Sequence, residues 1–301
     1  MFRRFLIYSI PATIALLTIR IAVADENQPT NSVLAPSTPI ITPAVNPTNS
    51  SNTPAPSALQ TSLQSASQPV ERSSYSSVHV DGPYIAMTFD DGPHPTLTPK
   101  LLDILKERHI HVTFFVLGQM VKDHPEILQR EVAEGHEIGN HTWDHLALTK
   151  VVNKEGGLKH EIVDTSELIK QVTGNSPTLL RPPYGATTAR LSRAIEKEYG
   201  MKVILWSVDP VDWRDPGAKV VSERILSGWK ESGGAKAGAI ILSHDIHKGT
   251  IEAMPATLDA LLAKGFKFVT VSELMAMESK NPVTCPPPGA KKTDNSKKKD
   301  S

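Results

Sequence analysis

The chain has 301 residues, and its 32 Lys and Arg residues balance its 32 Asp and Glu residues. This balance leaves no basic footprint of the kind that nucleic-acid-binding proteins carry, so we expect no nucleic-acid partner. The sequence contains a single cysteine, Cys285, which excludes a disulfide bond within the fold.

The first 24 residues have the pattern of a secretory signal. Two arginines precede an apolar run from Phe5 to Thr18, and Ala22-Val23-Ala24 forms a small-x-small cleavage site. The apolar run is short for a membrane span. We therefore predict a signal peptide at 1–24, cleavage after Ala24, and a protein secreted or held in the cell envelope. An uncleaved membrane anchor is the alternative.

Two further segments have compositions typical of disorder. Residues 25–76 are rich in Pro, Ser and Thr, and no charged or aromatic residue lies between 27 and 70. Such a segment cannot bury enough apolar surface to offset the entropy cost of ordering it, so we predict a disordered linker. We also predict a disordered, Lys-rich tail at 283–301. Residues 77–282 remain, enough for one domain with a full core.

Within this domain, apolar runs alternate with helical patterns. We predict strands at 84–89, 111–116, 136–140, 178–181, 201–206, 238–243 and 266–271. We predict helices at 97–108, 124–134, 155–172, 187–199, 218–231, 251–264 and 272–278. Strands that alternate with helices indicate an α/β fold with a parallel sheet. We expect a distorted parallel (β/α)7-type barrel, with an open doubly wound sheet as the alternative.

Residues able to do chemistry follow the carboxyl ends of the predicted strands, where sites gather in either fold. In chain order they are Asp90 and Asp91, His141 and His145, Arg181, Asp209, and His244. Their recurrence at one edge of the sheet predicts a single cleft. This clustering is stronger evidence for a functional site than any one of these residues is alone.

The first two groups have the residue types of a catalytic metal site. Asp90 and Asp91 are neighbours at a strand end and point different ways, which suits two roles, a metal ligand and a general base. A plain Asp-Asp-Gly turn is the alternative. His141 and His145 are four residues apart and can face one ion. With Asp91 they give the ligand count of a catalytic zinc-type site, which also suits Co²⁺ or Ni²⁺.

Five short motifs in this order carry a family resemblance. They are Thr88-Phe-Asp-Asp-Gly92, His141-Thr-Trp-Asp-His145, Arg181-Pro-Pro-Tyr184, Asp209-Pro-Val-Asp-Trp213 and Leu242-Ser-His244. With them the chain resembles the polysaccharide deacetylases of carbohydrate esterase family 4, over about residues 80 to 275. The resemblance implies a deformed (β/α) barrel and metal-dependent removal of acetyl groups from sugars.

The resemblance also implies a role for each motif. The metal ligands would be Asp91, His141 and His145. The proton-transfer residues would be Asp90 as general base, oriented by Arg181, and His244 as general acid, paired with Asp209. The acetyl group would meet the backbone N–H of Tyr184, an oxyanion donor, and a wall formed by Leu242 and Trp213.

We therefore predict a metal-dependent hydrolase, acting as a monomer, that removes N-acetyl groups from N-acetylglucosamine in a cell-wall polysaccharide. Peptidoglycan is the favoured substrate, and chitin oligomers and acetyl-xylan are the alternatives. A glycosidase with paired acids is a rival reading, but it leaves the histidines unexplained. A glycan-binding module without catalysis is another, but it predicts that a ligand, acid or base is missing.

Overall fold

A computed structural model describes residues 72–278 of the chain. The predicted signal peptide, the predicted tail with Cys285, and nearly all of the predicted linker lie outside these described residues. The linker prediction ran too far toward the domain. Ser74–Tyr75, which we assigned to the linker, forms strand β1 and pairs in parallel with Val203 and Ile204.

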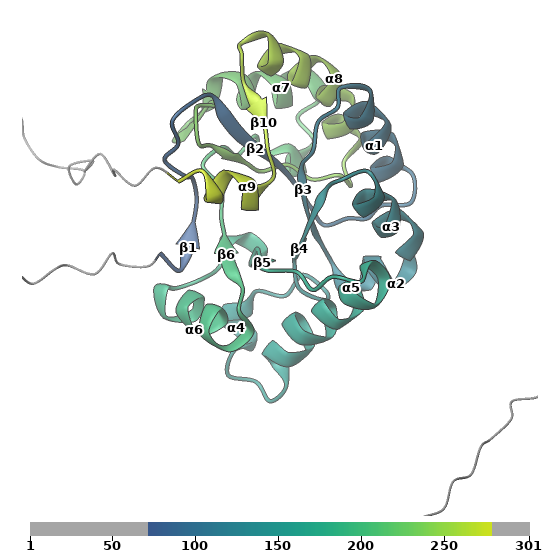
Figure 1. Ribbon diagram of the computed structural model, residues 1–301, viewed down its shortest axis with the longest axis vertical. Helices are drawn as coiled ribbons and strands as arrows, with labels where there is room; N and C mark the ends of the chain where they lie inside the picture. The colour runs from purple at the N-terminus through teal and green to yellow at the C-terminus, as the bar shows by residue number, and fades with distance from the viewer. Residues whose placement is uncertain (1–71, 279–301) are drawn as a thin grey trace, which may run out of the picture. The chain divides into compact units, whose positions relative to one another are not determined.

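The core of the domain is a curled sheet in which every pairing is parallel. Its order is β1-β6-β5-β4-β3-β2-β10, and β9 also pairs with β2 (Figure 1). After β1, the strands are β2 (Tyr84–Asp90), β3 (Thr113–Val116), β4 (Glu137–Asn140), β5 (Leu179–Leu180), β6 (Lys202–Ile204), β9 (Ile240–Ile241) and β10 (Lys267–Phe268). All seven predicted strands are present, although several are shorter than predicted.

The chain beyond β6 closes the curl. Ser207 donates its backbone N–H to Ile240 at 3.0 Å, and the N–H of Leu242 donates to Val208 at 2.9 Å. Val208 and Ile241 thereby form a parallel bridge. Because β9 is also paired with β2, the two sides of the sheet are linked. The predicted distorted barrel is confirmed, and an open sheet is excluded.

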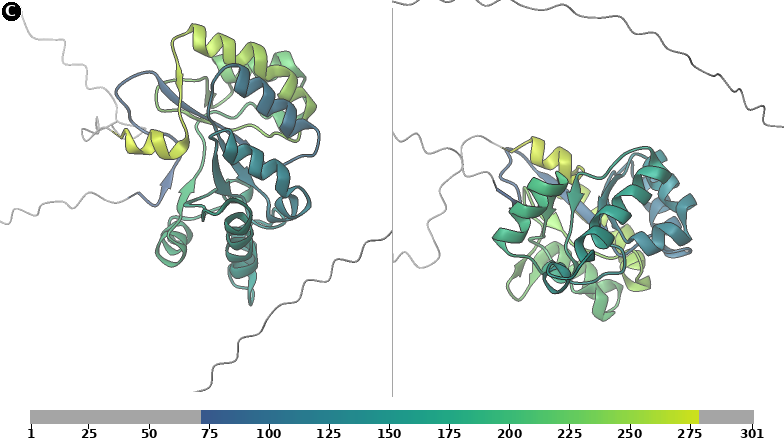
Figure 2. Two further views of the ribbon diagram at one scale, coloured as in Figure 1. Left: turned by 45° about the vertical axis from the view of Figure 1, so that its right-hand side comes forward. Right: turned by 90° about the horizontal axis from the view of Figure 1, so that it is seen from below.

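Helices surround the strands on the outside (Figures 1 and 2). They are α1 (Leu97–Glu107), α2 (Gly118–Asp123), α3 (Pro125–Ala133), α4 (Leu148–Val151), α5 (Thr165–Thr173), α6 (Ala189–Tyr199), α7 (Ala218–Ser227), α8 (Lys248–Ala263) and α9 (Val271–Ala276). Helices α2 and α4 are too short to give a periodic pattern, and we did not predict them. Among the described residues no helix has the length and apolar character that crossing a membrane requires.

Two predicted helices have different ends in the structure. The helix predicted at 155–172 begins as a π-helix, Lys159–Asp164, which continues into α5. The helix predicted at 218–231 ends at Ser227, and an antiparallel hairpin follows, β7 (Gly228–Trp229) with β8 (Ser232–Gly233). Gly228 has φ 87°, and a side chain there would meet the hairpin backbone, so the helix stops at this glycine.

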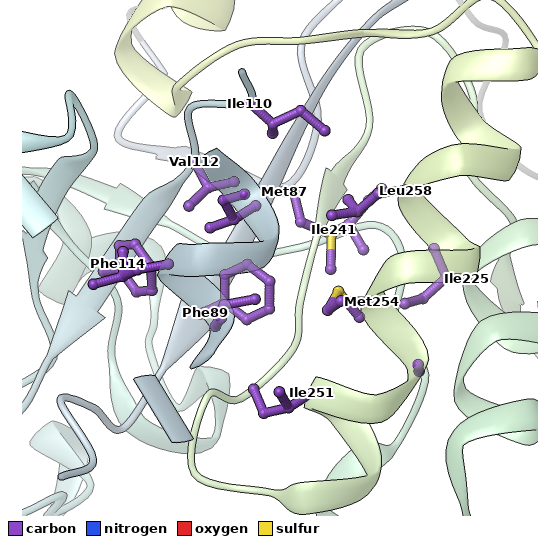
Figure 3. Packing of buried hydrophobic residues seen from close by; sticks show 14 of the residues in the cluster. Met87, Phe89, Ile110, Val112, Phe114, Ile225, Ile241, Ile251, Met254 and Leu258 are labelled. Atoms are coloured by element: carbon purple, nitrogen blue, oxygen red, sulfur yellow. The ribbon is translucent and has the colours of Figure 1, made fainter. Parts of the chain in front are cut away.

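The largest apolar cluster lies between β2 and the helices that flank it. Met87 and Phe89 on β2 pack with Ile241 on β9 and with Met254 and Leu258 on α8 (Figure 3). From Ile85 to Asp90 every residue of β2 is buried, as expected for a central parallel strand covered on both sides. This packing fixes the strand whose end carries Asp90 and Asp91.

Candidate active site

A cavity of about 440 Å³ opens at the carboxyl ends of the strands. Nearly all of the residues that we predicted from the sequence line it. The lining consists of Asp90, Asp91, His141, His145, Pro182, Tyr184, Trp206, Asp209, Trp213, Leu242 and His244. The remaining predicted residue, Arg181, is fully buried and contacts Asp90. The structure therefore brings all of the predicted site residues to one place.

Asp91, His141 and His145 converge as a candidate metal site. Asp91 Oδ1 lies 3.4 Å from Nε2 of each histidine, and the three candidate ligand atoms lie within 4.8 Å of one another. Asp91 Oδ1 is buried, and no described group donates a well-aligned hydrogen bond to it. A buried carboxylate oxygen facing two imidazole nitrogens fits a divalent cation, with the ligand set of a catalytic site.

The other ring nitrogen of each histidine is already engaged. His141 Nδ1 lies 2.7 Å from the carbonyl oxygen of Arg181, which only accepts, so Nδ1 carries the proton. His145 Nδ1 lies 3.2 Å from the hydroxyl of Tyr184. These outer contacts fix the orientation of both rings. The Nε2 atoms are left to face Asp91.

The charges at this point favour a cation. Burial alone would raise the pKa of Asp91, but contact with His141 and its charge hold that pKa well below its usual range. Burial would lower the pKa of His141, yet Asp90 and Asp91 outweigh it and raise that pKa. Burial lowers the pKa of His145, which favours the neutral ring that a metal requires. The carboxylates therefore stabilise positive charge between the two rings.

Asp90 is held by a buried guanidinium. Arg181 Nη1 donates to Asp90 Oδ1 at 2.7 Å and to the hydroxyl of Thr88 at 2.7 Å. The guanidinium also lies 4.1 Å from the ring centroid of Phe115. This bond occupies Asp90 Oδ1, while Oδ2 lies 3.7 Å from Nε2 of His141. The predicted contact between Arg181 and Asp90 is present, and it fixes the carboxylate beside the metal ligands.

The partner of His244 differs from our prediction. We expected Asp209, but His244 Nδ1 lies 2.8 Å from Oδ1 of Asp212, and the pairing predicted with Asp209 is wrong. Asp209 Oδ1 instead accepts the backbone N–H of Val211 at 2.8 Å. Val211 has φ 54°, which turns the chain so that Asp212, the start of a 3₁₀ turn ending at Arg214, contacts His244.

Asp212 is well suited to charge His244. Its carboxylate also accepts the backbone N–H of His244 at 2.8 Å and the hydroxyl of Thr250 at 2.7 Å. Burial would lower the pKa of His244, but the hydrogen bond and charge of Asp212 raise it to about 9. Burial would raise the pKa of Asp212, yet these same bonds lower it. An imidazolium paired with a carboxylate results, with Nε2 left as the unshared ring nitrogen.

The two proton-transfer candidates are backbone neighbours. Asp90 and His244 form a parallel bridge, in which the N–H of Asp90 donates to the carbonyl oxygen of Ser243 at 2.9 Å. Asp90, at the end of β2, therefore lies beside His244, which comes shortly after β9. A substrate in the cavity would have a carboxylate and an imidazolium within reach.

Three further predicted residues line the same cavity. Tyr184 lies in a short turn, Pro183–Gly185, has φ 61° and is 72 % exposed. Trp213 is half exposed at the mouth, and Leu242 is buried. Their positions suit contacts with a bound acetyl group. Their roles as an oxyanion donor and as pocket walls remain predictions.

Three residues of the site, Asp212, Pro182 and Trp206, were given no role on the basis of the sequence. Asp212 stood inside a quoted motif, and its place beside Trp213 was the available signal. Trp206 lines the cavity, and its ring packs against Gly185, where a Cβ atom would lie 3.1 Å away. No pattern in the sequence distinguished Trp206 from a core residue.

Comparison with known proteins agrees with the geometry. Residues 77–204 match the polysaccharide deacetylase family model. The peptidoglycan-N-acetylglucosamine deacetylase PgdA of Listeria monocytogenes is 43 % identical over 190 residues, which cover 63 % of this chain and 38 % of that protein. A peptidoglycan-N-acetylglucosamine deacetylase of Bacillus cereus is 37 % identical over 196 residues, covering 64 % of this chain and 87 % of the relative.

A solved structure is similar as well. Peptidoglycan deacetylase PdaC of Bacillus subtilis superposes with a TM-score of 0.58 at 40 % identity, covering 65 % of this chain and 92 % of that one. Its curated name is peptidoglycan-N-acetylmuramic acid deacetylase, and the matched region is 38 % of the curated protein. The matched region thus corresponds to well under half of some relatives and to most of others. With its five motifs gathered around one cavity, the chain belongs to the polysaccharide deacetylase family.

Proposed function

We propose that this chain is a secreted, metal-dependent hydrolase that removes N-acetyl groups from N-acetylglucosamine residues of peptidoglycan. One observation carries the proposal: the Asp91–His141–His145 cluster shares one cavity with Asp90, a carboxylate bound by Arg181, and with His244, an imidazole bound by Asp212. A non-catalytic module has no need of this full set. A glycosidase has no need of the histidine cluster.

The chemistry follows from these groups. A divalent cation held by Asp91, His141 and His145 would supply Lewis acidity toward the acetyl carbonyl and toward an attacking water. We propose Zn²⁺, with Co²⁺ and Ni²⁺ as alternatives that the same donor set accepts. Selection among them also depends on geometry and on metal availability.

The protein's own residues handle the protons. Asp90 Oδ2 accepts the proton of the water that attacks the acetyl carbon, while Arg181 keeps Oδ1 occupied. The backbone N–H of Tyr184 donates to the oxyanion as it develops. His244 then gives its Nε2 proton to the amine that leaves, and Asp212 stabilises the charged ring. Trp213 and Leu242 enclose the acetyl methyl group.

The substrate proposal draws on relatives named for peptidoglycan, two for N-acetylglucosamine and one for N-acetylmuramic acid. A chitooligosaccharide deacetylase of Rhizobium leguminosarum at 36 % identity keeps chitin oligomers as a second candidate. An extracellular location suits both, with the 1–24 segment as the export signal. We propose that the enzyme acts as a monomer.

Acetate release tests the proposal. The full chain is incubated with peptidoglycan, chitin oligomers and acetyl-xylan in parallel, with and without a chelator. Mass analysis of digested peptidoglycan then assigns each lost acetyl group to N-acetylglucosamine or N-acetylmuramic acid. Chelator-sensitive acetate from N-acetylglucosamine supports the proposal. Acetate from none of the substrates in the presence of Zn²⁺ overturns it.

A further inference from the structure

The loop that carries both histidine ligands has an unfavourable backbone. It follows the end of β4, and Thr142 has φ 76° and His145 has φ 65°. Residues other than glycine rarely adopt this left-handed backbone conformation, and they keep it only where the surrounding structure holds them in it. The loop therefore needs partners that fix its peptide groups.

Backbone N–H groups of helix α2 support part of the histidine loop. The N–H of Gly118 donates to the carbonyl oxygen of Thr142 at 2.9 Å, and the N–H of Gln119 donates to that of Trp143 at 3.0 Å. A side chain at Gly118 would collide with the indole of Trp143. These contacts hold the carbonyl groups of the loop and leave its N–H groups to other partners.

A buried carboxylate accepts one of these N–H groups. Glu161 is 2 % exposed, and its Oε2 accepts the N–H of Trp143 at 2.9 Å. The peptide group of Trp143 lies between His141 and His145. Glu161 plays no part in the proton transfers proposed above, so its burial needs another explanation.

The π-helix places Glu161 there. Lys159–Asp164 winds wider than an α-helix before α5 begins, and π-turns of this kind recur at functional sites. Its carbonyl group at Ile162 accepts a bond of 2.9 Å from the amide of Asn140, at the end of β4. The Asn140 side chain in turn accepts the N–H of Thr142 at 2.7 Å. The histidine loop is thus tied to the π-helix through two side chains.

We propose that Glu161 is a positioning residue for the metal site: by binding the peptide N–H of Trp143, midway between His141 and His145, it holds both rings toward Asp91. The inference rests on the metal site of the proposed function. It makes no claim about the substrate. Because Glu161 acts on the ligands only through the backbone, its removal should weaken metal binding without removing any ligand.

The test measures Zn²⁺ affinity of the full chain by competition with a metal indicator. Glu161→Met keeps the bulk but accepts no hydrogen bond, and we expect a 10- to 100-fold loss, on the order found for outer partners of metal ligands. Glu161→Gln retains an acceptor oxygen and should bind within about tenfold of the parent chain. Glu167→Met, at an exposed position of α5, is the matched control and should leave affinity unchanged.

Folding is checked on the metal-free proteins by circular dichroism and thermal unfolding. A merely structural role would lower the melting temperature but leave the folded variant's affinity at the parent value, and that result overturns the inference. Glu161→Asp draws the carboxylate back by one methylene and should also lose affinity, so it replaces the Met variant if that one fails to fold. If folded Glu161→Met or folded Glu161→Asp binds Zn²⁺ with the affinity of the parent chain, the role of Glu161 is refuted, even if acetate release is established. If neither the parent chain nor any variant releases acetate, but Glu161→Met still loses Zn²⁺ affinity, only the proposed function is refuted.

Discussion

At the scale of single residues, the choice between two aspartates decides the properties of His244. Asp209 and Asp212 stand three positions apart in one motif, and their spacing alone does not tell which one contacts the imidazole. The left-handed conformation of Val211 makes the difference, because it turns Asp212 inward and leaves Asp209 to bond its own loop. The spacing of residues along the chain does not show which of two nearby aspartates the backbone turns toward the imidazole.

Asp212→Asn should move the alkaline limit of activity. His244 must be protonated to act as an acid, so turnover is lost as pH rises through its pKa, which Asp212 raises to about 9. Without that carboxylate the pKa should fall toward the ordinary value of about 6.5, and the alkaline limb should shift down by about two pH units. Profiles of kcat against pH measure this change.

Asp209→Asn is the matched control for that shift. Within residues 72–278, Asp209 forms no hydrogen bond or ion pair with the imidazole, so the alkaline limb should stay where it is in the parent enzyme. A shift in this variant, with none in Asp212→Asn, would contradict the pairing that we describe.

Asp90→Asn should separate metal binding from turnover. The amide still receives the bond from Arg181 through its oxygen, and Asp91, His141 and His145 are untouched, so metal content should be unchanged. Loss of the proposed general base should lower kcat by about 100- to 10,000-fold. Elemental analysis and acetate release on the same sample measure both quantities. Full activity would remove Asp90 from the mechanism.

At the scale of elements, the sequence predicted the strands well because most of them are apolar runs bounded by turn residues. The π-helix and the hairpin after α7 were not predicted. A π-turn inserts into a helical pattern without altering which residues are apolar, and the β7–β8 pair is too short for an alternating pattern. The π-helix also contacts a distant part of the chain, through the side chain of Asn140 on β4.

Leu258→Ala on α8 should destabilise the barrel. Its side chain is fully buried against β2 and β9, and truncation of such a leucine costs about 2–5 kcal/mol in free energy of unfolding. Leu262, one turn along the same helix, is 41 % exposed, and Leu262→Ala should change that free energy by less than about 1 kcal/mol. Urea denaturation of the metal-free proteins compares them. Equal losses would show that α8 does not pack as described.

At the scale of the whole molecule, binding of a cation should be visible as stability. A ligand that binds only the folded chain adds about 2.7 kcal/mol at a concentration 100 times its dissociation constant. For a domain of this size the melting temperature should then rise by about 5–10 °C on addition of Zn²⁺. His141→Ala should lose most of this rise, along with bound metal measured by elemental analysis. A rise that persists in this variant would place the cation elsewhere.

The fold class and the position of the site were predictable because parallel strands present their carboxyl ends at one edge, so residues that follow separate strands had to meet. What the sequence left open was the closure of the barrel. It depends on the backbone of Ser207 and Val208 meeting β9, beyond the end of regular β6. Backbone bonds between irregular segments leave no residue-type signature.

The backbone bridge between Asp90 and His244 has a consequence for how this architecture can change. The proposed base and the proposed acid are paired residues on neighbouring parallel chain segments, whose backbones lie about 4.8 Å apart. Movement of the surrounding loops leaves that interval as it is. New specificities can therefore arise by remodelling the rim, while the reactive pair stays in register and its chemistry is inherited intact.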